Sequence, residues 1–123
     1  AGWRGTLENI AAEALNRIRM EFGVEPSEFH SVMGPGISPC CYRVDEGRAQ
    51  VFVERYGERS NVVLLQEDYS LDLFRANIIN LLEAGLNEEN IYMVGGCTCC
   101  EKGFFSYRRE GLTGRQGAFI FLR

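Results

Sequence analysis

The sequence has little histidine, little proline and no long hydrophobic run. It contains one histidine and three prolines among 123 residues, and its formal net charge is −4. One histidine is too few for a blue-copper site, which needs several histidine ligands together with cysteine. No apolar run reaches the roughly 20 residues of a membrane span, and acids and bases are mixed without the basic face that nucleic acid or an anionic membrane requires. We therefore expect neither nucleic acid nor a membrane as a partner.

The chain has the length of one ordinary domain, and its 46% hydrophobic content is normal for a globular core. It opens with AGWRGT at residues 1–6, with neither an initiator Met nor a strand ahead of this turn. A Gly-Trp-Arg-Gly turn that feeds a helix is typical of the interior of an active-site loop. We therefore expect the chain to be the C-terminal part of a larger protein, with part of any active site outside it.

Apolar residues at helical spacing predict three helices, over 6–22, from Asp45 to about Tyr56, and from Ser70 to near Gly85. The side chains of Thr6, Asp45 and Ser70 are the expected N-caps. The first helix is expected to bury one face. In the second helix, Val51 and Phe52 are expected to face the core.

Short apolar runs predict strands at 29–33, 62–65, 91–94 and 118–122, and residues 40–44 are expected to be extended. Residues 34–39 and 95–103 are expected to be loops, while 104–109 are expected to be extended or irregular. Alternating helices and strands predict the α/β class, with mixed layers of helices packed on mixed β-sheets.

The cysteines form two groups, Cys40 with Cys41, and Cys97 with Cys99 and Cys100. An odd count and adjacent pairs are awkward for structural disulfides, so we expect reduced thiols and a cytoplasmic location. Cys97 and Cys100 have the spacing of one metal knuckle, but Cys40 and Cys41 lack the spacing of a second. We therefore prefer small thiols without metal and predict that replacing Cys99 and Cys100 together by serine leaves zinc content unaltered.

Two segments are candidates for binding anions. Residues 104–115, FFSYRREGLTGR, combine aromatics, hydroxyls and arginines; guanidinium forks suit phosphate or carboxylate, and aromatic faces suit bases or sugars. Arg4 lies at a helix start, where anions are favoured. The alternatives are an exposed arginine pair beside ordinary core phenylalanines, and a tight loop in which Trp3 anchors the core. The single histidine, His30, is expected to have a structural role.

Three motifs follow one another in a characteristic order: AGWRGT at 1–6, GPGISPCCY at 34–42, and CT at 97–98 followed by FFSYRREGLTGR. In these motifs the chain resembles the YfiH/YlmD-like proteins, long named multicopper polyphenol oxidase or laccase-like. The resemblance implies that residues 1–123 are the C-terminal half of a single α/β domain. It also implies a zinc-dependent purine nucleoside phosphorylase that takes adenosine, inosine or methylthioadenosine with phosphate, and that has adenosine deaminase activity.

The resemblance implies a zinc site of two histidines and one cysteine, of which the last histidine directly precedes the AGWRGT turn. All three ligands then lie upstream of Ala1, in the missing N-terminal half, and the chain holds neither a catalytic residue nor a metal ligand. His30 and the five cysteines do not match those positions, so the chain alone is expected to be inactive. By the same match, the residues expected to bind substrate and phosphate are Arg4, Ser106, Tyr107 and Arg109.

Three other functions remain open. The older family name describes a polyphenol oxidase with copper as its metal. Some family members look like hydrolases of a murein-precursor amino-sugar peptide, and residues 104–115 do not separate a nucleoside from such a substrate because both carry sugar and anionic groups. The non-enzymatic alternative is a thiol-rich metal-knuckle domain that binds a partner.

Overall fold

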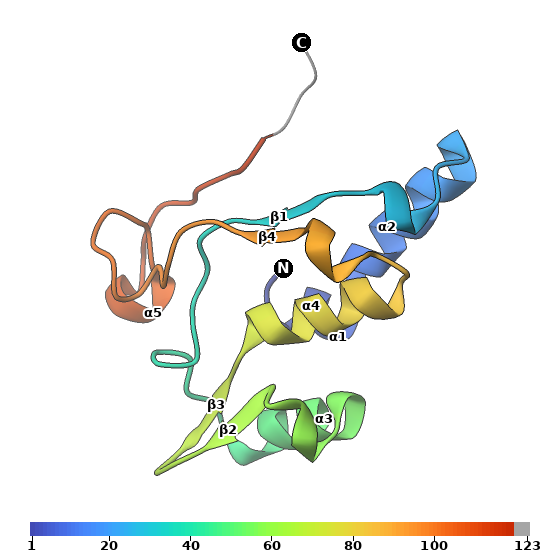
Figure 1. Ribbon diagram of the computed structural model, residues 1–123. Helices are drawn as coiled ribbons and strands as arrows, with labels where there is room; N and C mark the ends of the chain where they lie inside the picture. The colour runs from blue at the N-terminus through green and yellow to red at the C-terminus, as the bar shows by residue number, and fades with distance from the viewer. Residues whose placement is uncertain (120–123) are drawn as a thin grey trace.

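The computed structural model describes residues 1–119, which form helices stacked in layers with two small sheets (Figure 1). The helices are α1 (Trp3–Leu7), α2 (Ile10–Phe22), α3 (Glu46–Tyr56), α4 (Leu73–Glu83) and α5 (Tyr107–Glu110), and the strands are β1 (Ser31–Met33), β2 (Val63–Leu65), β3 (Tyr69–Leu71) and β4 (Ile91–Met93). Single 3-10 turns occupy Pro26–Glu28, Glu58–Ser60 and Glu88–Asn90. This architecture confirms the predicted α/β class. Within residues 1–119, no helix has the length and apolarity needed to cross a bilayer.

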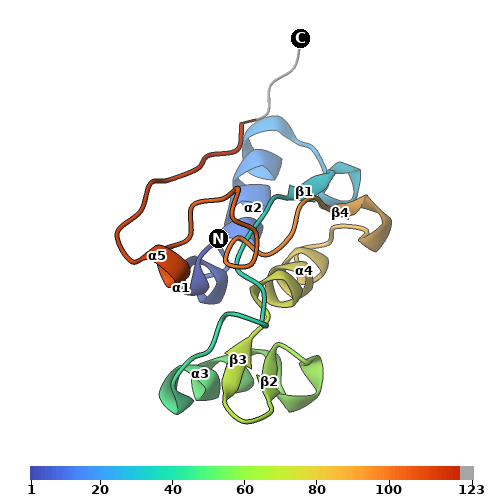
Figure 2. The same cartoon turned by 90° about the vertical axis from the view of Figure 1, so that its left-hand side faces the viewer.

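Each sheet has two strands. β2 and β3 pair antiparallel, and with α3 they form one layer of the molecule (Figure 2). β1 and β4 pair parallel, with Ser31 opposite Ile91 and Met33 opposite Met93. The long connection between β1 and β4 contains α3 and α4, as a parallel crossover requires.

One core lies between α3, the β2–β3 hairpin and α4. Its buried members are Tyr42, Phe52, Val62, Leu71, Leu73 and Ala76, and Trp3 packs against it. A second, smaller core joins α2 to α4 through Leu15, Leu81 and Leu86. Helix α4 serves both cores, because Leu73 and Ala76 in its first half belong to the first core and Leu81 near its end belongs to the second.

The predicted first helix is wrong as a single element. It is broken between α1 and α2 at Asn9, whose backbone is left-handed with φ of 56°, a conformation that asparagine tolerates better than most residues. Thr6 does not cap the helix; its hydroxyl lies within α1 and donates to the Gly2 carbonyl over 3.0 Å. Only Ala12 and Leu15 of α2 are buried, so much of the predicted buried face is uncovered.

The two other helix starts differ in how well the sequence predicted them. Asp45 caps α3, as predicted, by accepting from the backbone N–H of Arg48 over 2.8 Å. Ser70 does not cap α4, since it lies in β3, and Asp72 takes that role. Phe52 is fully buried as predicted, but Val51 is 47% exposed, because consecutive helical residues point about 100° apart.

The remaining differences concern short segments. Cys40 and Cys41 lie in a turn rather than an extended segment, with the N–H groups of Cys41 and Tyr42 both donating to Ser38 O. Residues 107–110 form a helix instead of irregular chain. Three predicted strands are shorter in the structure: β1 lacks residues 29–30, β2 lacks residue 62, and β4 lacks residue 94. Of the strand predicted at 118–122, residues 118–119 have no regular structure. The rest of the strand predicted at 118–122 lies outside the described residues.

Apolar side chains of the β1–β4 sheet are more exposed than is usual for a parallel sheet. Val32, Tyr92 and Met93 are 58%, 46% and 54% exposed. Parallel sheets are normally buried on both faces, so residues 1–119 leave apolar surface uncovered at this sheet.

Candidate functional site

The turn at the start of the chain is fixed by a buried polar anchor. The side chains of Thr6 and Asn80 are both fully buried. The Thr6 carbonyl accepts from Asn80 Nδ2 over 2.9 Å and from the Tyr56 hydroxyl over 3.2 Å, while Thr6 Oγ1 accepts from Asn77 Nδ2 over 3.0 Å. Because buried polar groups are costly unless paired, this network holds α1 in one position against α4.

Trp3, in the first turn of α1, lies against two guanidinium groups. The Arg4 and Arg48 guanidinium carbons lie 5.1 and 4.6 Å from its ring centroid, within the range of cation–π attraction. Arg48 comes from α3 and also pairs with Asp45 at 3.7 Å. Two arginines far apart in the sequence thus share one indole.

Tyr42 brings a third arginine to the same region. The Arg108 guanidinium lies 5.2 Å from the Tyr42 ring centroid, and its Nη1 donates to the Arg43 carbonyl over 3.0 Å. Burial raises the pKa of the Tyr42 phenol, and the positive charges of Arg48 and Arg108 partly oppose that rise. We call Arg4, Arg48 and Arg108 the arginine cluster. It places three cations around Trp3 and Tyr42, an arrangement suited to an anion.

A cavity of about 500 Å³ opens where the N-terminal residues meet α2, β1 and α4. Most of its wall is apolar, and its lining includes Ala1, Ile10, Val32, Ile37, Phe74 and Asn77. Both amide protons of Asn77 are used, one on Thr6 Oγ1 and one on the Leu73 carbonyl. The hydrogen-bonding atom that remains on the Asn77 side chain is its amide oxygen, Oδ1, which is an acceptor.

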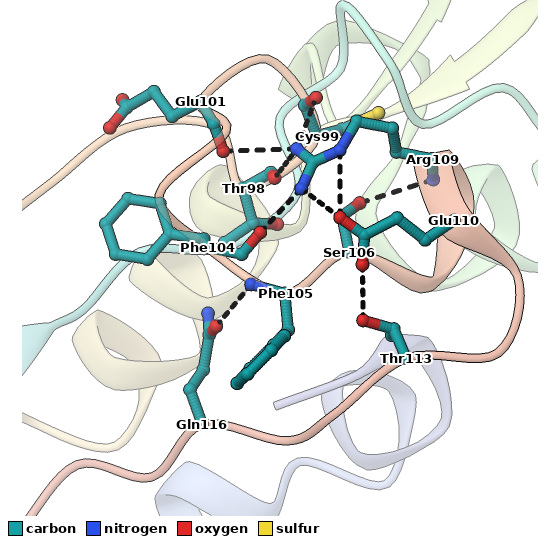
Figure 3. A network of polar contacts seen from close by, with 10 residues as sticks. All are labelled: Thr98, Cys99, Glu101, Phe104, Phe105, Ser106, Arg109, Glu110, Thr113 and Gln116. Carbon is teal, nitrogen blue, oxygen red and sulfur yellow. Dashed lines mark hydrogen bonds and ion pairs between the residues drawn. The ribbon is translucent and has the colours of Figure 1, made fainter.

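The Arg109 guanidinium donates hydrogen bonds to several backbone carbonyls of the loop that precedes α5 (Figure 3). Its Nη1 donates to the carbonyls of Thr98, Cys99 and Glu101 over 2.9, 3.0 and 3.1 Å, and its Nη2 donates to Phe104 O over 2.6 Å. Its Nε and Nη2 also reach the Glu110 carboxylate at 3.2 and 2.5 Å. Since every guanidinium N–H is engaged, the contacts of Arg109 are those of a structural clamp.

The four residues predicted to bind substrate therefore differ in their surroundings. Ser106 is buried and caps α5 by accepting from the Arg109 N–H over 3.4 Å. Tyr107 is 74% exposed, and Arg4 is exposed beside Trp3. The structure thus joins Ser106 to Arg109, while within residues 1–119 no hydrogen bond or ion pair connects Arg4 to either of them.

Sequence reasoning missed Arg48 as a possible functional residue. It carries no motif signal, since it follows an ordinary helix cap by three positions. Its importance comes from the packing of α3 against the first turn of α1. Arg108 was visible in the C-terminal motif, but only the structure distinguishes its position from that of Arg109.

Four of the five cysteines meet at one point. The sulfur atoms of Cys40, Cys41, Cys97 and Cys100 all lie within 4.8 Å of one another, and all five thiols are free. Burial opposes ionisation of Cys97, but N–H groups of Ser38, Cys100 and Cys99 outweigh it and lower its pKa to about 6. The hydrogen bond with Cys100 raises the pKa of Cys41. The sequence spacing did not predict this cluster.

The described residues do not match the metal site that the resemblance implies. His30 is exposed, stacks on Tyr92 with ring centroids 5.9 Å apart, and places Nδ1 3.4 Å from the Tyr92 hydroxyl. Among residues 1–119 the one group with metal-ligand geometry is made of thiols and includes no histidine. A site of two histidines and one cysteine therefore does not fit the residues present.

Comparisons with known proteins agree over the whole chain. The family model for multi-copper polyphenol oxidoreductase laccase matches residues 1–123. The purine nucleoside phosphorylase YlmD of Geobacillus stearothermophilus is 38% identical over 125 residues, covering 98% of this chain and 46% of the relative. The protein of the same name from Bacillus subtilis is 36% identical over 128 residues, covering 100% of this chain and 46% of the relative.

Solved structures give the same result. The crystal structure of YlmD from Geobacillus stearothermophilus superposes with a TM-score of 0.80 at 36% identity, covering 89% of this chain and 42% of that one. The hypothetical protein YfiH of Bacillus licheniformis also gives a TM-score of 0.80, at 33% identity and with the same coverage. The chain spans about half the length of the curated bacterial relatives described above. Because the family match runs from the first residue to the last, the chain belongs to the multi-copper polyphenol oxidoreductase laccase family, and the YfiH/YlmD-like resemblance is confirmed.

Proposed function

We propose that residues 1–123 are the C-terminal half of a single domain that acts as a purine nucleoside phosphorylase. The names of the YlmD relatives support the activity, and the 46% of their length that this chain covers supports a half-length piece. Its place in the C-terminal half rests on the family resemblance. The uncovered side chains of Val32, Tyr92 and Met93 support it independently, because a parallel sheet requires cover that residues 1–119 do not provide. The upstream half is the proposed cover.

The observation that carries the phosphorylase proposal is the arginine cluster. Phosphorolysis requires a phosphate ion held in one orientation beside the ribose. Guanidinium groups supply paired donors and a permanent positive charge for this task. Arg4 and Arg48 share the Trp3 ring, and Arg108 lies over Tyr42, so their charges are brought to one region by rigid aromatic side chains.

The cavity beside the N-terminal turn is the proposed place for the nucleoside. Its apolar wall suits a flat base, and the free carbonyl oxygen of Asn77 suits an amino or ring N–H group of a purine. Ala1 and Gly2 line this cavity, and the family resemblance places a zinc-binding histidine directly before Ala1. The nucleoside would therefore lie close to the upstream residues.

The proposed reaction needs no covalent bond to the protein. A phosphate oxygen attacks C1′ of the ribose, the bond from C1′ to the purine nitrogen breaks, and the base leaves with the bonding electrons and takes up the proton that the hydrogen phosphate gives up. Ribose 1-phosphate and the free base result. The task of this chain's residues is to hold the phosphate by charge and to orient the nucleoside against it.

The finer parts of the proposal rest on the family resemblance. They are zinc binding by the upstream half, use of adenosine, inosine and methylthioadenosine, adenosine deaminase activity and a cytoplasmic location. The described residues do not supply that zinc site. The family name also suggests copper, but a four-thiol group and a single histidine do not form the histidine-rich site of a blue-copper oxidase.

The test is phosphate-dependent release of free base from adenosine by the protein made from its complete reading frame. The 123-residue chain, assayed alongside, is expected to be inactive. In the complete protein, Arg48→Ala is expected to raise the KM for phosphate about tenfold, the loss of about 1.4 kcal/mol of binding. Arg59→Ala, which removes an exposed arginine from the turn after α3, is the matched control. Base release that does not depend on phosphate would contradict the proposal.

A further inference from the structure

Two loops that are distant in the sequence are held tightly against each other. The parallel pairing of β1 and β4 continues into them through a bridge between Gly36 and Cys97, and the Thr98 N–H donates to Gly36 O over 3.0 Å. Gly95 has φ of +87°, and a Cβ there would lie 2.5 Å from Pro35 Cγ. This close approach brings the 34–41 loop and the 95–103 loop together, with cysteines on both.

The four sulfur atoms have the spacing of a metal tetrahedron. Cys41 and Cys100 are 3.4 Å apart, Cys40 and Cys100 are 3.7 Å apart, and Cys40 and Cys41 are 3.8 Å apart. A zinc–sulfur distance of about 2.3 Å in a regular tetrahedron separates neighbouring sulfur atoms by about 3.8 Å. A disulfide would bring one pair to about 2.05 Å. The arrangement is therefore that of four separate ligands around one point.

The local backbone explains how adjacent cysteines reach the same point. The turn at residues 38–41 folds back on Ser38, whose carbonyl accepts from the N–H groups of Cys41 and Tyr42. The Ser38 N–H itself donates to Cys97 Sγ over 3.4 Å. Hydrogen bonds of this kind orient ligand atoms and stabilise thiolate charge in metal sites.

We propose that Cys40, Cys41, Cys97 and Cys100 bind one zinc ion in a tetrahedral site made of four thiolates. Four protein ligands leave no open position for water or substrate, so the site is structural rather than catalytic. Binding releases the thiol protons, because only thiolates coordinate zinc. The site is separate from the upstream zinc set that the family resemblance implies, and it stands whether or not the protein is a phosphorylase.

The zinc ion would join the 34–41 loop to the 95–103 loop. The second loop supplies the Thr98 and Cys99 carbonyls that Arg109 grips. Arg109 in turn fixes the start of α5, which carries Arg108 to Tyr42. The proposed zinc site therefore supports the position of Arg108, one member of the arginine cluster, without itself contacting the anion that the cluster would bind.

The first test compares zinc content by elemental analysis in variants of the protein made from its complete reading frame. Cys100→Ser is expected to lose one zinc ion per chain relative to the unsubstituted protein, which reverses the expectation from spacing alone that replacing Cys99 and Cys100 leaves zinc content unaltered. Cys99→Ser is the matched control, since Cys99 lies in the same loop but outside the four-sulfur group, and it is expected to retain that zinc. Zinc bound elsewhere in the protein would contribute equally to every variant. Unchanged zinc in Cys100→Ser, or equal loss in Cys99→Ser, would overturn the assignment.

A second test uses the unsubstituted protein and so does not depend on the folding of a variant. Alkylation followed by peptide mapping is expected to show all four cysteines protected in the zinc-loaded protein and reactive after chelation. Exchange of zinc for cobalt is expected to give thiolate-to-metal charge-transfer bands and the visible spectrum of a tetrahedral ion. Recovery of Cys41 and Cys100 as a disulfide, or iron or copper in place of zinc, would overturn the proposal.

Discussion

Asn80 Nδ2 donates to the backbone oxygen of Thr6 over 2.9 Å, and both side chains are fully buried. This contact joins α4 to α1 across 74 residues of sequence. The Asn80 carbonyl oxygen is also used, since it accepts from Arg55 Nη2 over 3.3 Å. One amide therefore fixes the turn that carries Trp3 and Arg4 and also ties α4 to α3.

We predict that Asn80→Ala lowers the free energy of unfolding by about 2–3 kcal/mol, because it removes buried hydrogen bonds and leaves a small void. The measurement is urea denaturation of the protein made from its complete reading frame. Asn16→Ala, on the exposed surface of α2, is the control and is expected to change stability by less than about 0.5 kcal/mol. Equal effects of the two substitutions would contradict the anchoring role of Asn80.

Arg109→Lys is expected to destabilise the protein by about 2–3 kcal/mol, because an ammonium group cannot replace the guanidinium fork that serves four carbonyl oxygens. Faster hydrogen exchange in residues 98–104 is expected to accompany this loss. Arg59→Lys is the control. A substrate-binding role for Arg109 predicts instead that Arg109→Ala weakens turnover much more than folding, and that result in the complete protein would favour substrate binding over the clamp.

The Glu110 carboxylate makes part of the stability depend on pH. The Thr113 hydroxyl and then the Arg109 guanidinium donate to it and hold its pKa below the usual value of 4.5. A lowered folded-state pKa stabilises the fold above the unfolded-state value, and the contribution disappears as pH falls through the folded-state pKa. Glu110→Gln is therefore expected to be less stable than the unsubstituted protein at pH 7 and to match it in strong acid. A stability difference that does not change with pH would contradict this assignment.

The start of α4 offers a direct comparison of two possible caps. Asp72 Oδ1 accepts from the Arg75 N–H over 2.9 Å, so Asp72→Ala is expected to cost about 1 kcal/mol of unfolding free energy. Ser70→Ala is expected to cost less than about 0.5 kcal/mol, because Ser70 does not cap the helix. Thermal unfolding of both variants measures the difference, and the opposite order would restore the sequence-based assignment.

These two residues also show where prediction from the sequence ends. The cap at Asp45 was predictable because the signal and the helix are adjacent. At the next helix two capping residues stand close together, and pairing of Leu65 with Tyr69 in the β2–β3 hairpin places Ser70 in a strand. That choice depends on contacts outside the segment, which local propensity does not contain.

The candidate site was predictable only in part for the same reason. Its motifs identified the family and marked Arg4 and Arg109 as unusual. The acceptors of Arg109 are backbone carbonyls, which leave no trace in the residue pattern. The partner of Cys41 is Cys100, 59 residues away, and only the turn after Ser38 brings them together.

The left-handed residue between α1 and α2 has a consequence for the origin of the arginine cluster. Asn9 Oδ1 is the buried side-chain polar atom without a hydrogen-bond partner among residues 1–119, so this position carries a cost in stability. An unbroken helix over residues 3–22 would be a straight rod about 30 Å long, and its first turn would continue along the axis of α2. The reversal of backbone handedness at a single residue redirects that turn toward α3. Whether Trp3 reaches Arg48 at all is thus decided six residues further along, by the backbone conformation of Asn9.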